Sequence, residues 1–113
     1  MIQDTLYAEY IKERMDCDVL ENETGFITYR IIGQECFIAD MYVPARLRTA
    51  GKGRSLVGEL EEIAKLKGCK FISATIYLKD GGASNTLTAA LLVGFRVIAA
   101  DQGVLTIIKE TQE

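Results

Sequence analysis

A strand-like apolar run, a glycine-containing bend and a long amphipathic helix follow one another in the middle of the chain and restrict its fold more than any other feature. The run is Cys36 to Val43, the bend lies before Gly53, and apolar residues then recur at helical spacing until Gly68 ends the helix. The segment from Lys70 to Leu78 is a further strand candidate. Because a helix separates the two strands, they are predicted to lie parallel through a right-handed crossover.

Short turns on either side of this unit predict antiparallel strands. Before it, a helix capped by Asp4 is predicted through Met15; after it, a second helix capped by Ser84 or Asn85 is predicted to end at Gly94. The predicted strands outside the crossover are 17–21, 25–32, 95–100 and 104–109. The sequence thus predicts an α+β (mixed α/β) fold, with a mostly antiparallel sheet, one parallel βαβ crossover and about three helices.

The composition bounds the size and class of the protein. With 113 residues and 49% hydrophobic content, the chain is expected to form a single domain over 1–113. No apolar run approaches the roughly 20 residues that span a bilayer. The N-terminus also lacks the basic-then-apolar order of an export signal, so the protein is expected to be cytoplasmic and not bound to a membrane. A formal charge of −3 and a pI near 5.0 disfavour a nucleic acid as the main partner.

The cysteine and histidine content limits the chemistry. Cys17, Cys36 and Cys69 are odd in number and form no closely spaced pair, so they predict neither a disulfide framework nor a zinc site. They are expected to be reduced thiols in the core. The chain contains no histidine. Mechanisms built on a histidine base are therefore excluded, and no metal site is predicted.

The bend before the central helix is typical of an anion-binding site. Its sequence, Arg48-Thr-Ala-Gly51-Lys-Gly53, places two glycines where the helix begins. Glycine lets a ligand approach the backbone, and the first N–H groups of a helix lack helical partners, so a phosphate or pyrophosphate is the expected guest. No Walker motif is present, and the third glycine of a dinucleotide fingerprint falls on Leu56. A helix start without a ligand stays an alternative.

The order of elements and three motifs resemble the GCN5-related N-acetyltransferase (GNAT) family, as a small truncated member, over roughly residues 17–109. The bend matches the family's acetyl-CoA motif, Val43-Pro44 precedes it, and Gly94-Phe95 follows the second helix. The resemblance implies acetyl-CoA as the acyl-donor cosubstrate, with its pyrophosphate on the backbone N–H groups from Thr49 to Arg54 and its pantetheine arm along the strand near Met41. The implied cofactor-binding residues are Met41, Val43, Arg48, Thr49, Ala50, Gly51, Lys52, Gly53, Arg54 and Asn85.

The acid–base positions of the family are not matched in this chain. Many relatives carry a base on the strand at positions that are Phe37 and Ala39 here, and a tyrosine acid on the second helix at a position that is Ala90 here. Asp40 is the remaining carboxylate near the expected acetyl site, and we expect it to act as a base or as an amine-binding anion; the alternative is a solvated structural acid. Strand alternation directs Asp40 away from the side of Met41, unless a β-bulge turns it.

These residues predict an acetyl-CoA-dependent N-acetyltransferase that acts on an amine, either a small molecule or a peptide. Asn85 is expected either to hydrogen-bond the pantetheine arm or to cap its helix. Two alternatives stay open: an acyl-CoA-binding regulatory module that lacks acid–base groups, and an interaction domain that keeps only the fold. The chain is shorter than typical relatives, so the acceptor groove is expected to be open or completed by a second subunit in a homodimer.

Overall fold

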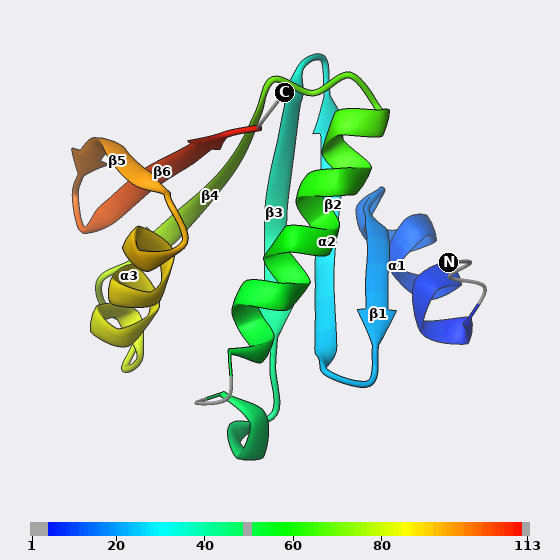
Figure 1. Cartoon of the computed structure of the whole chain (residues 1–113), viewed down its shortest axis with the longest axis horizontal. Helices are drawn as coiled ribbons and strands as arrows, with labels where there is room; N and C mark the ends of the chain where they lie inside the picture. Colours follow the sequence, from blue (N-terminus) through cyan, green and yellow to red (C-terminus); the bar gives the residue numbers. More distant parts are fainter. Residues whose placement is uncertain (1–4, 49–50, 112–113) are drawn as a thin grey trace.

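The computed structural model describes residues 5–48 and 51–111, and over these residues the chain forms an α+β fold. Each predicted strand is present, with ends that differ from the prediction by a residue at most. No helix within the described ranges is long and apolar enough to cross a membrane. In chain order the elements are α1 (Leu6–Met15), β1 (Asp18–Asn22), β2 (Gly25–Ile32), β3 (Glu35–Tyr42), a 3-10 turn (Ala45–Leu47), α2 (Lys52–Leu66), β4 (Phe71–Tyr77), α3 (Ala83–Leu92), β5 (Arg96–Asp101) and β6 (Val104–Glu110) (Figure 1).

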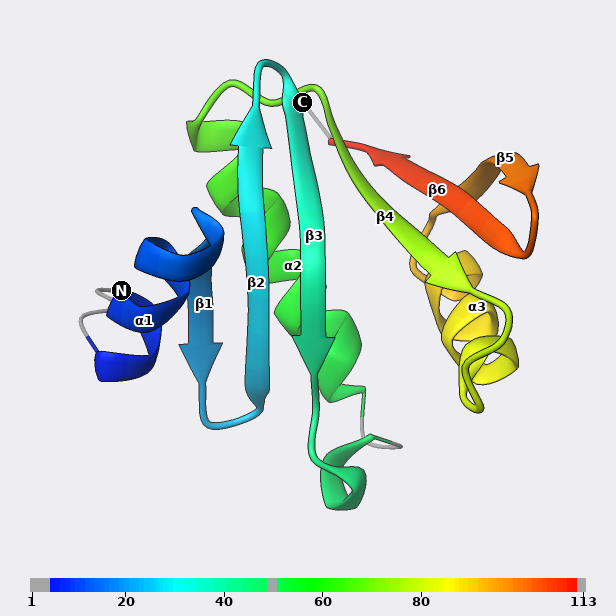
Figure 2. The same ribbon diagram turned by 180° about the vertical axis from the view of Figure 1, so that it is seen from behind.

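The six strands form one mixed sheet in the order β1-β2-β3-β4-β6-β5. Strands β3 and β4 are parallel, and each other neighbouring pair is antiparallel. The predicted crossover is therefore confirmed. Figures 1 and 2 show that α2 covers one face of the sheet, while α1 lies on the opposite face beside β1. These are called the α2 face and the α1 face below.

The parallel pair is short, and its strands diverge. Only Glu35–Phe37 of β3 pairs with Phe71–Ser73 of β4, after which the two strands separate, as Figure 2 shows. Where the pairing ends, the hydroxyl of Ser73 donates a hydrogen bond to the carboxylate of Glu35. Ser73 is only 3% exposed, so this bond satisfies a buried hydroxyl at the apex of the divergence. Beyond the apex, the edges with which β3 and β4 face each other have no strand partner among the described residues.

A β-bulge in β3 sets which side chains face α2. Tyr29 of β2 pairs with Ile38 and Thr28 pairs with Asp40, so Ala39 is an extra residue in β3. Without it, Asp40 would share the face of Ile38, as plain alternation predicts. With it, Met41 faces α2, and Asp40 faces the α1 side. The grouping of Asp40 with Ile38 that alternation predicted is therefore wrong, whereas its position opposite Met41 is confirmed.

The core has two parts, one on each face of the sheet. The larger part packs the sheet against α2 and α3, and its members Leu56 and Leu60 are fully buried. Each such burial stabilises the fold by about 1.5–3 kcal/mol. The smaller part, which includes Ile11 and Val19, packs α1 against the other face. Cys17, Cys36 and Cys69 are buried free thiols, as the sequence predicted, and burial raises the pKa of Cys36 to about 12.

Two helix starts differ from the prediction. The cap of α1 is Thr5, whose hydroxyl accepts from the Ala8 N–H at 3.0 Å; Asp4 lies outside the described residues. The cap of α3 is Gly82, so Ser84 and Asn85 both lie inside the first turn and neither caps the helix. The cause is a tight turn in the preceding loop, in which the N–H of residue 83 already bonds the Asp80 carbonyl at 3.1 Å.

Candidate functional site

A cleft of about 780 Å³ lies where β3 and β4 diverge, between the start of α2 and the inner side of α3. Its lining is mainly apolar, and it includes consecutive residues of β4 from Ala74 to Tyr77. Consecutive strand residues point to opposite faces of a sheet, so the cleft passes between the strands and reaches residues of both faces. The polar and charged residues along it are Asp40, Arg48, Arg54, Thr75, Tyr77, Asp80 and Thr86.

The start of α2 forms one end of the cleft. Gly51 is the N-cap with φ +74°, a conformation that favours glycine, and no side chain among residues 5–48 and 51–111 caps the helix. The first helical bond is from the Ser55 N–H to the Gly51 carbonyl, so the N–H groups of Lys52, Gly53 and Arg54 have no helical acceptor. The N–H groups of Thr49 and Ala50 were also predicted to bind the pyrophosphate, but these two residues lie outside the described residues.

The charges of this first turn favour a bound anion. It contains Lys52 and Arg54 and no acidic residue. Cations at a helix N-terminus oppose the helix dipole and cost an isolated helix about 0.3–1 kcal/mol each. An anion bound between these cations and the N–H groups makes the electrostatic energy of the helix start favourable. The turn therefore has the charge pattern expected of a phosphate site and not of a self-capped helix.

Close packing sets the position of the bend on β3. A Cβ atom built on Gly53 would lie 3.5 Å from the Met41 Cε and 3.9 Å from a Val43 methyl, whereas one on Gly51 would meet no atom within 4 Å. The bend thus rests on β3 at Gly53 and leaves open space beside Gly51. Both glycines line the cleft. A phosphate-bearing ligand with an apolar arm fits the free N–H groups, the open space and the apolar lining together.

Two backbone groups predicted to pair with the pantetheine arm have internal partners in this structure. The Nε of Arg48 donates to the Val43 carbonyl at 2.8 Å, which ties the bend to the end of β3. The Met41 N–H donates to the Asp40 carboxylate at 2.9 Å. An arm that pairs with the Met41 N–H must displace its internal contact, whereas the Val43 carbonyl has a second lone pair and can accept a further hydrogen bond. The assignment of Met41, Val43 and Arg48 to cofactor binding stays a prediction.

The structure separates the predicted site residues into two groups. Asp40, exposed on the α1 face, lines the cleft, as do the apolar residues Phe37, Ala39 and Ala90 that occupy the usual acid–base positions. Asn85 is exposed and does not line the cleft; its neighbour Thr86 does. Sequence reasoning missed Thr75 and Thr86, because a threonine in a strand or helix carries no local signal of what it faces.

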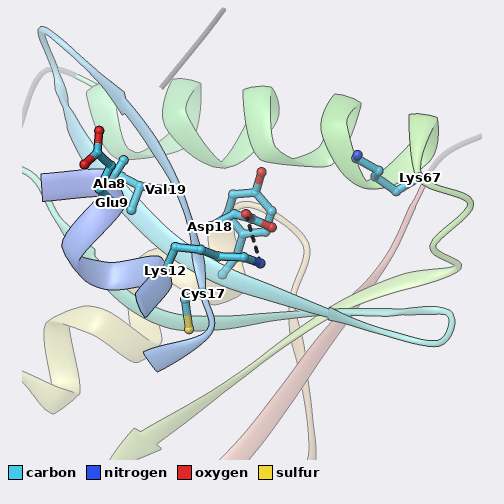
Figure 3. A pocket seen from close by; sticks show the side chains of 8 residues that line it. Ala8, Glu9, Lys12, Cys17, Asp18, Val19 and Lys67 are labelled. Atoms are coloured by element: carbon cyan, nitrogen blue, oxygen red, sulfur yellow. Dashed lines mark ion pairs between the residues drawn. The ribbon is translucent and has the colours of Figure 1, made fainter. Parts of the chain in front are cut away.

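A second, smaller cavity of about 350 Å³ lies beside α1 and β1 (Figure 3). Two acidic and two basic side chains line it, and the Lys12 ammonium lies 3.6 Å from Asp18 and 3.5 Å from Asp16. Tyr29 also lines it, and burial raises the pKa of that phenol to about 12. The cleft between β3 and β4 has more than twice the volume of this cavity and includes the start of α2 in its lining. The cleft between β3 and β4 is therefore the candidate site.

A diverging parallel strand pair with a cationic helix start at its cleft is suited to a phosphate-bearing ligand with an apolar arm. The model of the acetyltransferase (GNAT) family matches residues 5–87 of this chain. The chain therefore belongs to the GNAT acetyltransferase family, whose fold supports acetyl transfer from acyl-CoA in general. No curated protein sequence matches the chain.

Solved structures of acetyltransferases share this fold. The PaiA N-acetyltransferase from Thermoplasma acidophilum, in complex with coenzyme A, superposes with a TM-score of 0.74 and 21% identity over 93% of this chain and 69% of its own. A putative acetyltransferase from Agrobacterium tumefaciens gives a TM-score of 0.66 and 17% identity over 97% of both chains. Nourseothricin acetyltransferase gives 0.70 and 20% over 79% of this chain, which spans only 58% of that enzyme.

Proposed function

We propose that the protein is an acetyl-CoA-dependent N-acetyltransferase that acts on an amine, either a small molecule or a peptide. The observation that supports this best is the cleft through the sheet, with an uncapped helix start at one end and the Asp40 carboxylate on the opposite face. The two substrates of an acyl transfer can then enter from opposite faces of the sheet. Each would meet the other between β3 and β4.

The residues of the α2 face hold the donor in this proposal. The N–H groups of the first turn of α2 bind the pyrophosphate of acetyl-CoA, with added charge from Lys52 and Arg54. The apolar lining near Val57 and Ile76 covers the pantetheine arm. The thioester supplies an acetyl carbonyl that is activated toward nucleophiles. The apolar walls exclude water and so protect that thioester, and they hold it in position for attack.

Asp40 is the group that we assign to the amine. The amine nitrogen bonds to the acetyl carbon as the carbon–sulfur bond breaks. An ammonium acceptor loses two protons overall: Asp40 takes the first, directly or through water, and passes it to solvent, and the second goes to the leaving thiolate. Tyr77 lines the cleft from β4 and is the phenol that we assign to the latter step. Catalysis relies mainly on positioning, because the usual acid–base positions are Phe37, Ala39 and Ala90.

Asp40→Asn is expected to lower kcat/KM by about a hundredfold at pH 7, the low end of the usual contribution of a general base. The neutral fraction of an alkyl amine, whose pKa is about 10.4, rises steadily with pH, so the loss should shrink as the pH is raised toward 10. Thiol release from acetyl-CoA, measured from pH 6.5 to 10, tests this. Asp80→Asn is the matched control, because Asp80 also lines the cleft but lies in the loop after β4. An equal loss at every pH would show that Asp40 positions the acceptor and is not a base.

A regulatory acyl-CoA-binding module is the second candidate function. It is favoured by the three apolar residues Phe37, Ala39 and Ala90, which all line the cleft. Such a module would be stabilised by acetyl-CoA in a thermal shift assay, yet it would release no thiol above the uncatalysed rate with any amine. Thiol release with a panel of amines separates the two functions.

We also propose that the protein forms a homodimer through β5. This strand is exposed along its whole length at one edge of the described sheet. In an antiparallel pair of two such edges, Arg96 of one copy would lie opposite Asp101 of the other, which makes the strand self-complementary. Sedimentation is expected to give twice the 12.5 kDa mass of one chain, and Val97→Lys is expected to halve it. A single-chain mass for the unmodified protein would contradict the dimer.

A further inference from the structure

Three aromatic rings form a row on the α1 face of the sheet. Phe26 lies opposite Tyr42 across β2 and β3, and their ring centroids are 5.8 Å apart. Tyr7 of α1 packs on Phe26 from the other side, with a centroid distance of 5.3 Å. We call Tyr7, Phe26 and Tyr42 the aromatic row. Tyr42 is 46% exposed, so the row is open to a ligand at that end.

Two carboxylates lie along this row. Asp40 pairs with Thr28, the next residue of β2 on the same face, and Glu21 of β1 lies directly opposite Phe26. The pKa of the Tyr7 phenol is raised by burial and then by the negative charges of Asp40 and Glu21, so both carboxylates act at this ring. The negative faces of three rings and two carboxylates attract the same kind of ligand, a cation.

The row already holds a cation at its open end. The guanidinium carbon of Arg48 lies 5.9 Å from the centre of the Tyr42 ring, within the range of a cation–π contact. Arg48 reaches this position from the bend while its Nε bonds the Val43 carbonyl. A ligand cation therefore shares the Tyr42 ring with Arg48 or displaces it.

The row is also adjacent to the cleft. Asp40 belongs to both, because it lines the cleft and shares the α1 face with Phe26 and Tyr42. The helix start that binds the donor in the proposed function contacts Met41, on the α2 face of β3. Asp40 therefore connects the row with the α1 side of the cleft.

We infer that the aromatic row and Asp40 form the acceptor-binding surface, and that the acceptor is an organic cation whose ammonium end lies against Asp40 and the ring faces. This inference rests on the proposed acetyl transfer and names the class of acceptor and the face of the sheet from which it enters. A neutral amine of the same shape would gain only the apolar contact.

Choline and its neutral isostere 3,3-dimethylbutan-1-ol test the inference, because neither has an amine to acetylate and they differ by one charge. In an NMR titration with coenzyme A present, choline is expected to bind at least about tenfold more tightly than the isostere. Tyr42→Leu is expected to weaken choline binding between about twofold and fivefold, the size of an exposed cation–π contact, with little effect on the isostere. Asp40→Asn is expected to remove most of the remaining preference for charge.

Tyr10→Leu is the matched control. Tyr10 is a half-exposed tyrosine of α1 that carries its own cation, Arg14, 5.2 Å from its ring centre, and it is not part of the row. Equal binding of choline and the isostere, or equal weakening by Tyr10→Leu and Tyr42→Leu, would overturn the inference. Coenzyme A binding, measured separately in each variant, tests the proposed function, so the two can fail independently.

Discussion

Gly51→Glu is expected to weaken acetyl-CoA binding by at least about 100-fold while the domain stays folded. A side chain at Gly51 would meet open space, so it can be accommodated, but its carboxylate would lie at the uncapped start of α2. Two like charges about 4 Å apart near a protein surface repel by about 4 kcal/mol, more than the roughly 2.7 kcal/mol that a 100-fold loss requires. Isothermal titration calorimetry measures the change directly.

Gly33→Glu is the matched control for this variant. Gly33 has φ +60° against +74° for Gly51, and a side chain there also meets no atom within 4 Å. Both variants therefore carry the same added charge and a similar backbone strain of about 1–2 kcal/mol. Gly33 lies in the turn between β2 and β3, at the other end of β3 from the bend. If the two variants bind acetyl-CoA equally well, the bend is not the phosphate site.

Gly25→Ala is expected to destabilise the fold by at least about 3 kcal/mol. A Cβ atom on Gly25 would lie 2.1 Å from the backbone carbonyl oxygen of Tyr42, and the backbone has φ +151°. The clash is with main-chain atoms of the neighbouring strand, so no change of rotamer relieves it, and β2 and β3 must separate. For a domain of this size the melting temperature should fall by more than about 10 °C, which calorimetry or circular dichroism measures.

Gly103→Ala isolates the backbone part of that effect. Gly103 also has a positive φ, +83°, but an added Cβ there meets no atom within 4 Å. It should lose only about 1–2 kcal/mol, the cost of the left-handed conformation. Gly25→Ala should also move the end of β3 and so weaken acetyl-CoA binding, which Gly103→Ala should not. Equal losses of stability in the two variants would show that β2 and β3 are not packed as described.

The elements of the fold could be predicted because their signals are local. The apolar spacing from Leu56 to Ala64, the glycine at Gly68 and the strand run that follows each depend on neighbouring residues only. Chain connectivity then restricts the topology, since a helix between two adjacent strands requires them to be parallel. The bend is predictable for the same reason, because its glycines and the helix start are contiguous.

The part of the site around Asp40, by contrast, depends on contacts between residues that are distant in the sequence. The bulge at Ala39 is defined by pairing with Thr28 and Tyr29, and nothing in the residues around Ala39 alone indicates it. That one extra residue decides that Met41 supports the bend while Asp40 faces the aromatic row. The start of α3 at Gly82 instead of Asn85 similarly follows from a backbone turn in the preceding loop. Register and turn geometry are tertiary properties that a local pattern does not encode.

Because β3 and β4 pair over a short length only, the sheet consists mechanically of two panels, β1-β2-β3 and β4-β6-β5. Three residue pairs join the panels through the backbone, and the Lys109–Glu61 ion pair, at 3.2 Å and with both side chains largely buried, fastens the far panel to α2. A ligand that fills the space between the panels contacts both of them and so links them. Ligand binding then has two effects. It shifts the folding equilibrium by mass action, and it makes the unfolding of the two panels cooperative.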